Sequence, residues 1–446
     1  MRKPSLKLAF PSPLDSSKKA RLEYAFKVFA ATYGIPVADG GNELVYGTDI
    51  AARYGASSSP TTVSFRREAI PVLLGLTAGK PDALGEIFLW LSGEAEAASS
   101  VRDANGRVPY SESLFARHGI SPKRPWAAIW MEYLADLLVE KTGERYSPAR
   151  LGDRKHYVVS THDVDFYHVD RKGTLKRLIK NLAISVLVVK KPQFFFDTLK
   201  LLGKMLVGGS VGKFIPELVK KGDELGFRST FFFLCGGEHR RDANYKIDQL
   251  AAEMALLSQN RFDVGVHGSY ESVIEKRSLA QEAAALRQVT KVAPVGNRQH
   301  WLRFDSGENL GKQVSDGGFL YDSTLGFSET NGFRNGACFA FPPYDFANER
   351  AFGFLEFPLV VMDSALVSSR SPEADAREIL NESRRWGHGG VSLLWHDPVE
   401  PLAVSKKINS LYWRFLAERD RYDESWVSGQ EMYEKVSPRF REVGLL

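Results

Sequence analysis

Strand-like runs separated by helical stretches fill the chain from Lys155 onward, and this alternation most constrains its fold. Seven runs recur over this part of the sequence, at 157–160, 229–234, 263–266, 293–295, 319–322, 355–362 and 391–395. Strands that alternate with helices predict a parallel α/β sheet, and a set of this size is typical of a distorted (β/α)7-type barrel. Enzymes with such barrels carry their chemistry at the carboxyl ends of the strands.

The first 150 residues form a different unit, in which helices are the main expectation. Apolar residues at helical spacing predict helices over 16–34, 81–91 and 126–141, the first with a serine cap and a terminal glycine. The breakers Pro148 and Gly152 mark the boundary. The sequence therefore predicts a smaller N-terminal accessory domain over 1–150, α/β or mostly helical, and a barrel domain over 151–446.

The segment from about 171 to 213 is an unusually basic insertion in the barrel. It holds ten Lys or Arg residues against a single acid, Asp197, so its formal charge of +9 exceeds the +5 of the whole chain. It is also rich in Leu, Val and Phe, which predicts a basic amphipathic helix pair. Such a pair suits an anionic membrane surface or an anionic glycan. The alternative is a solvated helical hairpin that covers one face of the barrel.

Composition places the chain among soluble globular proteins. The net charge of +5 over 446 residues is too small to indicate nucleic acid as a partner. Two cysteines predict no disulfide framework and favour a reducing compartment. The start of the chain lacks the apolar core of a signal peptide, and no run is long enough to cross a bilayer. We therefore expect a cytoplasmic protein, with the basic segment allowing a peripheral position at the inner membrane face.

Two aspartates end the first strand-like run, His156 to Asp165. Because a strand alternates its faces, Asp163 and Asp165 point the same way. Like charges at such a distance raise a pKa unless a cation lies between them. The alternative is a surface turn in which both carboxylates are solvated.

Further polar residues follow the other runs. His267 ends a short strand, and Glu271 would face the same side if a helical turn began at Gly268. With Asp165 they would form an Asp-His-Glu ligand set, and nitrogen and oxygen ligands with an open position suit a catalytic divalent metal such as zinc. A structural role is the alternative for a lone histidine such as His267.

Arg298 and His396 are candidates for catalysis, and His300 for binding. The Arg298 guanidinium could hold a carboxylate ionised, or it could close a surface ion pair. His300, two residues on, could serve as a ligand or as a substrate contact. His396 follows an apolar run that would deliver its imidazole to the barrel mouth, where it could act as a general acid.

Taken in order, these parts resemble the polysaccharide deacetylase family, carbohydrate esterase family 4, over about residues 155–446. The motifs that carry the resemblance are 161–165 (Thr-His-Asp-Val-Asp), 229–234 (Ser-Thr-Phe-Phe-Phe-Leu), 267–271 (His-Gly-Ser-Tyr-Glu), 298–300 (Arg-Gln-His) and 393–396 (Leu-Leu-Trp-His). The resemblance implies that Asp163 is the base, Asp165 a metal ligand, Arg298 the group that orients the base, and His396 the general acid. The stretches 87–92 and 103–107 resemble a region that precedes such domains in bacterial proteins of unsettled function.

The chain departs from the family pattern at two positions. Val164 separates aspartates that are usually adjacent, and Glu271 stands where a second metal-binding histidine is usual. A carboxylate in that place would give a harder metal site.

The resemblance implies a hydrolase that removes acetyl groups, by N-deacetylation of an amino sugar or a surface-polysaccharide precursor. His300, Trp301, Tyr321 and Asp322 are the residues expected to line the sugar site. Core packing is the alternative for Trp301, Tyr321 and Asp322. The alternative, motivated by Glu271, is a protein of the same fold that binds a glycan or a partner in polysaccharide assembly without catalysis.

Overall fold

The structure is a computed structural model of the chain. It describes residues 5–10, 14–50, 61–77, 79–167, 171–184, 192–207, 213–236, 239, 241–243, 245–272, 278–387, 389–399 and 403–446.

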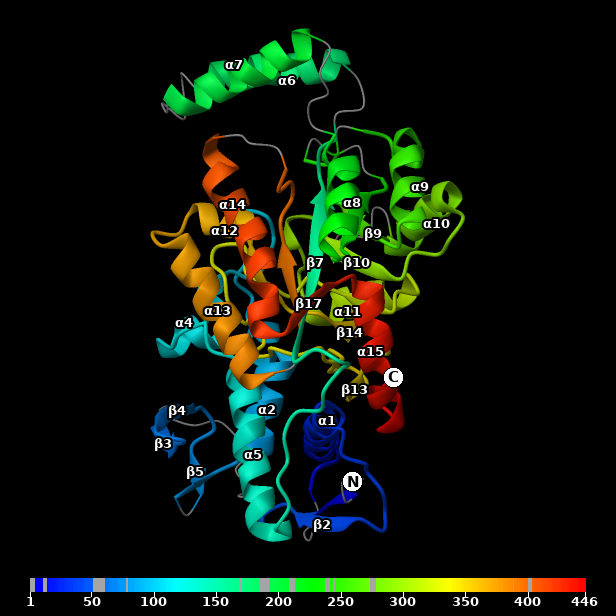
Figure 1. Cartoon of the computed structure of the whole chain (residues 1–446). Helices are drawn as coiled ribbons and strands as arrows, with labels where there is room; N and C mark the ends of the chain where they lie inside the picture. The colour runs from blue at the N-terminus through cyan, green and yellow to red at the C-terminus, as the bar shows by residue number, and fades with distance from the viewer. Residues whose placement is uncertain are drawn as a thin grey trace.

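A parallel sheet forms the centre of the molecule (Figure 1). Within the described ranges it has nine strands, eight of which follow the order β14-β11-β10-β9-β8-β7-β16-β15. Their bounds are β7 His156–Val164, β8 Thr230–Leu234, β9 Asp263–Gly268, β10 Gly296–Gln299, β11 Tyr321–Asp322, β14 Leu355–Glu356, β15 Leu359–Met362 and β16 Gly389–Leu394. The ninth, β17 (Glu424–Val427), pairs with the first half of β7, whereas β8 pairs with its second half.

The sheet curls because one short segment, residues 355–362, provides both of its edge strands. The edge strands β14 and β15 are separated only by Phe357 and Pro358. Proline has no N–H to donate to a ladder, so the predicted strand 355–362 breaks there and its two halves join opposite edges. The expected α/β barrel is confirmed as an open, curled parallel sheet.

Strand β10 begins after the expected run 293–295, and its sequence is polar. Its four residues, Gly-Asn-Arg-Gln, are all buried. Hydrophobic patterning could not locate this strand, because its side chains bond to other strands of the sheet instead of filling an apolar core.

Helices cover the outside of the sheet. They are α8 Phe214–Leu225, α9 Ala251–Gln259, α10 Leu279–Thr290, α11 Gly307–Asp316, α12 Asp363–Val367, α13 Pro372–Trp386, α14 Ala403–Glu418 and α15 Gly429–Glu442. In α8 the buried residues Phe214, Ile215, Leu218 and Val219 recur at helical spacing and form its inward face. The hairpin β12 Tyr344–Asp345 and β13 Arg350–Ala351 completes this part.

The N-terminal region combines helices with small sheets. Its elements are β1 Leu6–Ala9, α1 Ser16–Tyr33, β2 Asn42–Val45, β3 Thr61–Phe65, β4 Glu68–Val72, β5 Leu76–Thr77, β6 Lys80–Pro81, α2 Ala83–Ser92, α3 Glu94–Ala97, α4 Leu114–His118 and α5 Trp126–Thr142. The three predicted helices are present as α1, α2 and α5. Asp15, not a serine, caps α1 by accepting from the N–H groups of Ser17 and Lys18.

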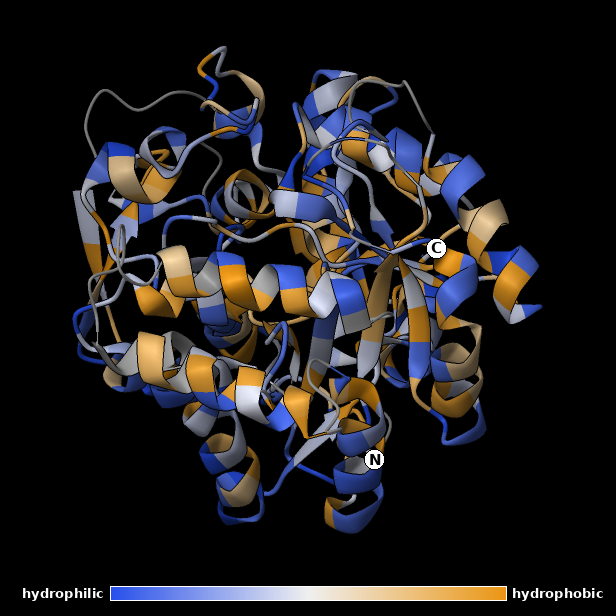
Figure 2. Cartoon of the chain, turned by 90° about the horizontal axis from the view of Figure 1, so that it is seen from above, coloured by the Kyte–Doolittle hydropathy of each residue, from blue (hydrophilic) through white to orange (hydrophobic). Residues whose placement is uncertain are grey.

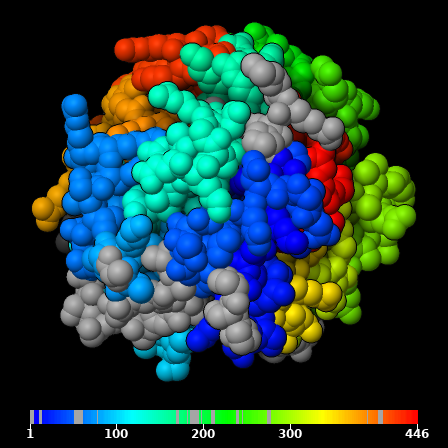
Figure 3. All heavy atoms as spheres, turned by 90° about the horizontal axis from the view of Figure 1, so that it is seen from below, coloured from blue at the N-terminus to red at the C-terminus, as the bar shows by residue number. Residues whose placement is uncertain are grey.

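The N-terminal region packs against the barrel without a break in the core. One buried apolar cluster extends from Leu6 to Leu445 through both parts. Tyr24 in α1 donates to the carbonyl of Pro342 at 2.6 Å, and Ala127 in α5 donates to that of Gly336 at 2.9 Å. Figure 3 shows N-terminal residues across the lower face of the molecule. The division at residue 150 stays a prediction.

The basic segment contains two helices, α6 Arg171–Ile184 and α7 Pro192–Leu206. They pack on each other through Leu178, Leu201 and Met205. The pair lies beyond the carboxyl end of β7 (Figure 1), and α7 contacts α14. Lys190 and Lys191 lie outside the described residues.

Among the described residues, no helix is both long and apolar enough to traverse a bilayer.

Candidate active site

The two aspartates predicted to share a face meet the same histidine. Asp163 is the penultimate residue of β7, and Asp165 follows the strand. Their carboxylate oxygens lie 3.6 Å and 3.2 Å from Nε2 of His267, at the carboxyl ends of β7 and β9, which flank β8 in the sheet. The surface-turn alternative therefore does not describe Asp163, which is buried.

Arg298 fixes Asp163. The arginine lies on β10, next to His267 on β9, and is fully buried. Its Nη1 donates to Asp163 Oδ1 at 3.0 Å and to Thr161 Oγ1 at 2.7 Å. Its remaining nitrogens donate to Ser323 and Ser392 at 2.8 Å. A guanidinium held on all sides in this way keeps the adjacent carboxylate in place.

The hydrogen bonds of His267 decide which of its nitrogens is available. Its Nδ1 lies 2.8 Å from the carbonyl oxygen of Arg298, and because a carbonyl only accepts, Nδ1 carries the proton. In the neutral ring Nε2 is then an acceptor, and it faces Asp165 Oδ1, which also accepts. Two acceptors at 3.2 Å need a proton or a cation between them.

His300 joins this pair from the turn after β10. Its Nε2 lies 3.5 Å from Asp165 Oδ2, and its Nδ1 lies 3.4 Å from the buried carboxylate of Asp242. Hydrogen bonds to these two carboxylates raise the pKa of His300 to about 9, although burial alone would lower it. Burial would raise the pKa of Asp165, but the neighbouring imidazoles of His267 and His300 hold it well below its usual range.

The chemistry of this donor set fits a divalent cation. Ligand atoms of Asp165, His267 and His300 lie within 4.8 Å of one another. Oδ1 of Asp165 is buried and accepts no hydrogen bond, so a polar atom that is costly to bury lacks a partner. One carboxylate and two imidazoles are a frequent set of protein ligands for zinc and related ions.

Glu271, expected as the third ligand, is not a member of this group. It lies in the turn that follows β9 and is partly buried. Gly268 is the last residue of the strand, and the helical turn assumed in the expectation does not begin there. The geometry favours His300 as the third ligand.

His396 also lies beside the carboxylate of Asp165. Its Nε2 lies 3.6 Å from Asp165 Oδ2, and its Nδ1 donates to Asp363 Oδ1 at 2.7 Å. Asp363 also accepts from the backbone N–H of His396 at 2.9 Å, which fixes the ring. Although burial would lower it, the charge of Asp363 and its hydrogen bond raise the pKa of His396 to about 10, so the imidazole has a proton to give.

The four residues predicted to contact the sugar differ in their exposure to solvent. His300 is a member of the cluster, and Trp301, 44% exposed, follows it at the surface. Tyr321 and Asp322 are fully buried in the core. Tyr321 shares a hydrogen bond with Thr230 at 3.3 Å, Asp322 accepts from Asn297 at 2.6 Å, and burial raises the pKa of both.

Two site residues were missed by the sequence analysis. Asp363 directly follows β15, so the rule that polar residues gather at carboxyl ends of strands could have found it. Asp242 lies in a loop between β8 and η3 (Ile247–Leu250), and no local pattern marks it.

The comparison with solved structures returns the family that the motifs resemble. A Mycobacterium smegmatis protein described as a polysaccharide deacetylase is 18% identical, covering 66% of this chain and 94% of its own, with a TM-score of 0.39. A polysaccharide deacetylase from Bacillus cereus is 9% identical, covering 61% and 91%, with a TM-score of 0.31. A carbohydrate esterase family 4 pseudoenzyme from Bacillus anthracis is 10% identical, covering 64% and 66%, with a TM-score of 0.31. No family model and no curated protein matches the chain.

Proposed function

We propose that this protein is a metal-dependent hydrolase that removes acetyl groups, by N-deacetylation, from an amino sugar or a surface-polysaccharide precursor. One observation carries the proposal: the ligand atoms of Asp165, His267 and His300 converge beside a carboxylate held by arginine and an imidazole held by carboxylate. A site that needed only to bind sugar would have no use for both a base and an acid.

The protein residues divide the work of hydrolysis. Asp163, held by Arg298, takes the proton of the attacking water. His396, charged beside Asp363, gives a proton to the leaving amine. Asp165, His267 and His300 would hold a divalent cation, which we propose to be zinc, and this cation would supply Lewis-acid polarisation of the acyl group and lower the pKa of water.

The alternative is a protein of the same fold that binds a glycan or an assembly partner without catalysis. Its support is Glu271, which departs from the expected metal motif. Against it stands the cost of burying Asp163 and Arg298 together, which a surface for binding alone would not require.

An Asp163→Asn substitution tests the proposal. Asparagine keeps the size of the side chain but cannot take a proton, so acetate release from N-acetylated chitooligosaccharides is expected to fall about 10²- to 10⁴-fold. Metal content should be retained, because Asp163 is not among the three ligands. The exposed Asp248→Asn is the matched control. Unchanged turnover in Asp163→Asn would refute the role of the base, and absence of acetate from every acetylated sugar tested would favour the binding protein.

We further propose a cytoplasmic location, with peripheral contact at an anionic membrane face through α6 and α7. Apolar side chains on this pair face solvent, namely Ile179, Phe196, Leu199 and Leu206, and Val207 just beyond is 85% exposed. The lysines at 172, 176, 180, 200 and 204 are exposed beside them. Figure 2, viewed from this side, shows hydrophobic and hydrophilic residues together on the hairpin. This mixture suits the interface of an anionic bilayer.

Co-sedimentation with vesicles tests the membrane contact. Binding is expected to vesicles that contain about one third phosphatidylserine at low salt, and to weaken at about 0.5 M salt because the charges are screened. Lys200→Glu with Lys204→Glu should abolish it, whereas Lys312→Glu on α11, the matched control, should not. Equal sedimentation with neutral and anionic vesicles, or none with either, would refute the contact.

A further inference from the structure

A loop of the N-terminal region reaches the edge of the candidate active site. Arg107 donates from Nη1 to the carbonyl of Trp301 at 2.8 Å, and Arg303 donates from Nε to the carbonyl of Asn105 at 2.6 Å. Tyr270 donates from its hydroxyl to Asn105 Oδ1 at 3.3 Å. Residues far apart in the sequence thus meet in one place. We call Asn105, Arg241, Tyr270, Trp301 and Arg303 the rim cluster.

The loop is held in shape by its own aspartate. Asp103 accepts from the backbone N–H groups of Asn105 and Arg107 at 2.8 Å and 2.9 Å. It also accepts from Arg107 Nε at 2.8 Å, which neutralises the charge of that arginine. Asn105 is therefore presented to the rim cluster from a fixed turn, and the loop needs little ordering when a ligand binds.

Among the described residues, neither Arg241 nor Arg303 forms an ion pair with a carboxylate. Arg241 donates to Asn105 Oδ1 and, at 2.6 Å, to the hydroxyl of Tyr270. Arg303 donates to the carbonyls of Asn105 and Tyr270. Both guanidinium groups thus keep their full positive charge while neutral groups hold them in position.

Aromatic rings hold the two guanidinium groups in place and leave an apolar surface beside them. Arg303 and Arg241 lie 4.3 Å and 4.8 Å from the ring centre of Tyr270. Arg241 also lies 5.1 Å from the ring of Trp301, which is partly exposed. A partly exposed indole next to a cation can stack on a sugar ring while the cation meets an acidic substituent of the same saccharide.

The rim cluster is coupled to the proposed metal ligands through two short connections. Trp301 directly follows His300, and their ring centres are 6.0 Å apart. Asp242 accepts from the backbone N–H of Tyr270 at 2.9 Å and lies 3.4 Å from Nδ1 of His300. A saccharide whose acetyl group reached His300 would therefore place a neighbouring group against Arg241.

We propose that the rim cluster recognises an anionic substituent, a carboxylate or a phosphate, carried by the acetylated saccharide next to the reacting sugar. This inference rests on the proposed function and narrows its substrate class from acetylated sugars in general to acidic ones. The guanidinium groups bind the anion, Trp301 stacks on the ring, and Asn105 brings the N-terminal region into substrate selection.

Isothermal titration of the full chain with three saccharides tests the inference. The saccharides are N-acetylchitotetraose (neutral), a hyaluronan tetrasaccharide (carboxylate) and N-acetylglucosamine 1-phosphate (phosphate). At low salt at least one acidic ligand is expected to bind about tenfold more tightly than the neutral one, because hydrogen bonds from a guanidinium to an anion are stronger than those to a neutral hydroxyl. The preferred acid identifies the source of the anion. Equal affinities, or no binding of any of the three, would overturn the inference.

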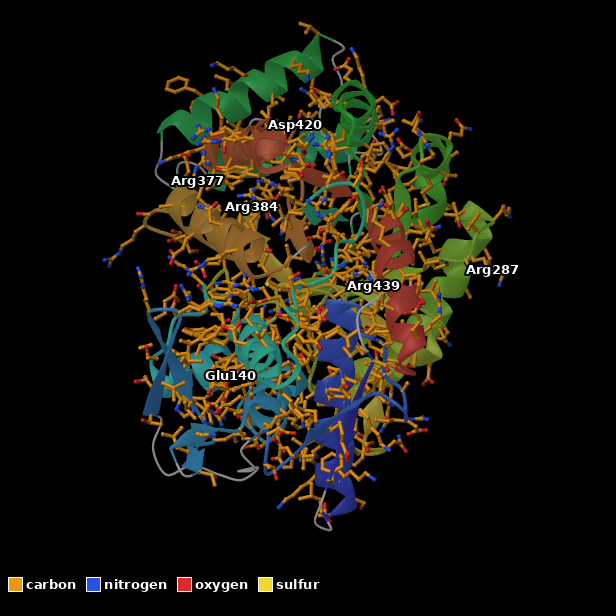
Figure 4. All side chains as sticks on the ribbon, turned by 60° about the horizontal axis from the view of Figure 1, so that its bottom comes forward. Glu140, Arg287, Arg377, Arg384, Asp420 and Arg439 are labelled. Carbon is orange, nitrogen blue, oxygen red and sulfur yellow. The ribbon has the colours of Figure 1, made fainter. Side chains whose placement is uncertain are left out.

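Variants of Arg241 distinguish anion binding from structural support of the loop. Arg241→Gln should reduce the acidic affinity to the neutral level, Arg241→Lys should retain part of the preference, and Arg287→Gln on the outer helix α10 should change nothing (Figure 4). If Arg241→Gln instead lowers the melting temperature and leaves the preference intact, the arginine only braces the loop and the inference fails. Acetate release is measured separately. A protein that binds acidic sugars preferentially but releases no acetate would refute the proposed deacetylation and leave the role of the rim cluster intact.

Discussion

Glu424 anchors the end of β7 opposite the site, and its removal should weaken the fold in a pH-dependent way. Its side chain is fully buried. It accepts from His156 Nδ1 at 2.8 Å and from Arg384 Nε at 2.9 Å, and Trp426 donates to its other oxygen at 2.9 Å. Arg384 reaches it from α13 (Figure 4). The strand that carries Asp163 is thus tied down where it begins.

The magnitude follows from the pKa of Glu424. Burial would raise that pKa, but the hydrogen bond and charge of His156, with Arg384, lower it from 4.5 to about 2. A folded-state pKa below the unfolded value stabilises the fold above the unfolded pKa, and this stability is lost as pH falls towards the folded pKa. The difference corresponds to about 3 kcal/mol at pH 7 and about 2 kcal/mol at pH 3.5.

Thermal unfolding of Glu424→Gln measures this contribution. At about 2.1 cal/mol/K of unfolding entropy per residue, 1 kcal/mol shifts the melting temperature of this 446-residue chain by about 1 °C. A decrease of about 3 °C at pH 7 and about 2 °C at pH 3.5 is expected. Glu308→Gln, which breaks an exposed pair with Lys312, should have almost no effect. If Glu424→Gln has the same melting temperature as the unsubstituted chain at pH 7, or if its melting temperature falls equally at both pH values, Glu424 does not stabilise the fold through its lowered pKa.

Two further predictions concern residues around the site. Asp363→Asn removes the carboxylate that raises the pKa of His396, so acetate release at pH 7 should fall about 10²-fold with metal content unchanged; a normal rate would show that His396 needs no such support. Arg298→Met leaves Asp163 buried without its cation and should lower stability by about 3–5 kcal/mol, read as a lower melting temperature beside Arg287→Met. An unchanged melting temperature would mean that water replaces the guanidinium.

Features that depend on residues close together in the sequence, such as strand faces and helices, could be predicted. The alternation of faces placed Asp163 and Asp165 towards one histidine, and the helices at 16–34, 81–91 and 126–141 follow from apolar spacing and glycine stops. The strand 296–299 was not predicted, because its buried residues are polar and form hydrogen bonds across the sheet.

Contacts between residues that are far apart in the sequence could not be predicted. Glu271 is near His267 in the chain, yet the side chain that meets Asp165 and His267 in space is that of His300, from the turn after the neighbouring strand. Asn105 looks like an ordinary turn residue, and only the shared core of the two regions brings it to Tyr270.

Metal content per chain, in protein purified without chelator, tests whether Asp165, His267 and His300 bind a divalent cation. We expect about one zinc or similar ion, lost in Asp165→Ala, His267→Ala and His300→Ala, and retained in Glu271→Ala. Absence of metal after reconstitution would contradict it and favour the binding protein. Loss in Glu271→Ala with retention in His300→Ala would contradict the ligand set that the geometry indicates.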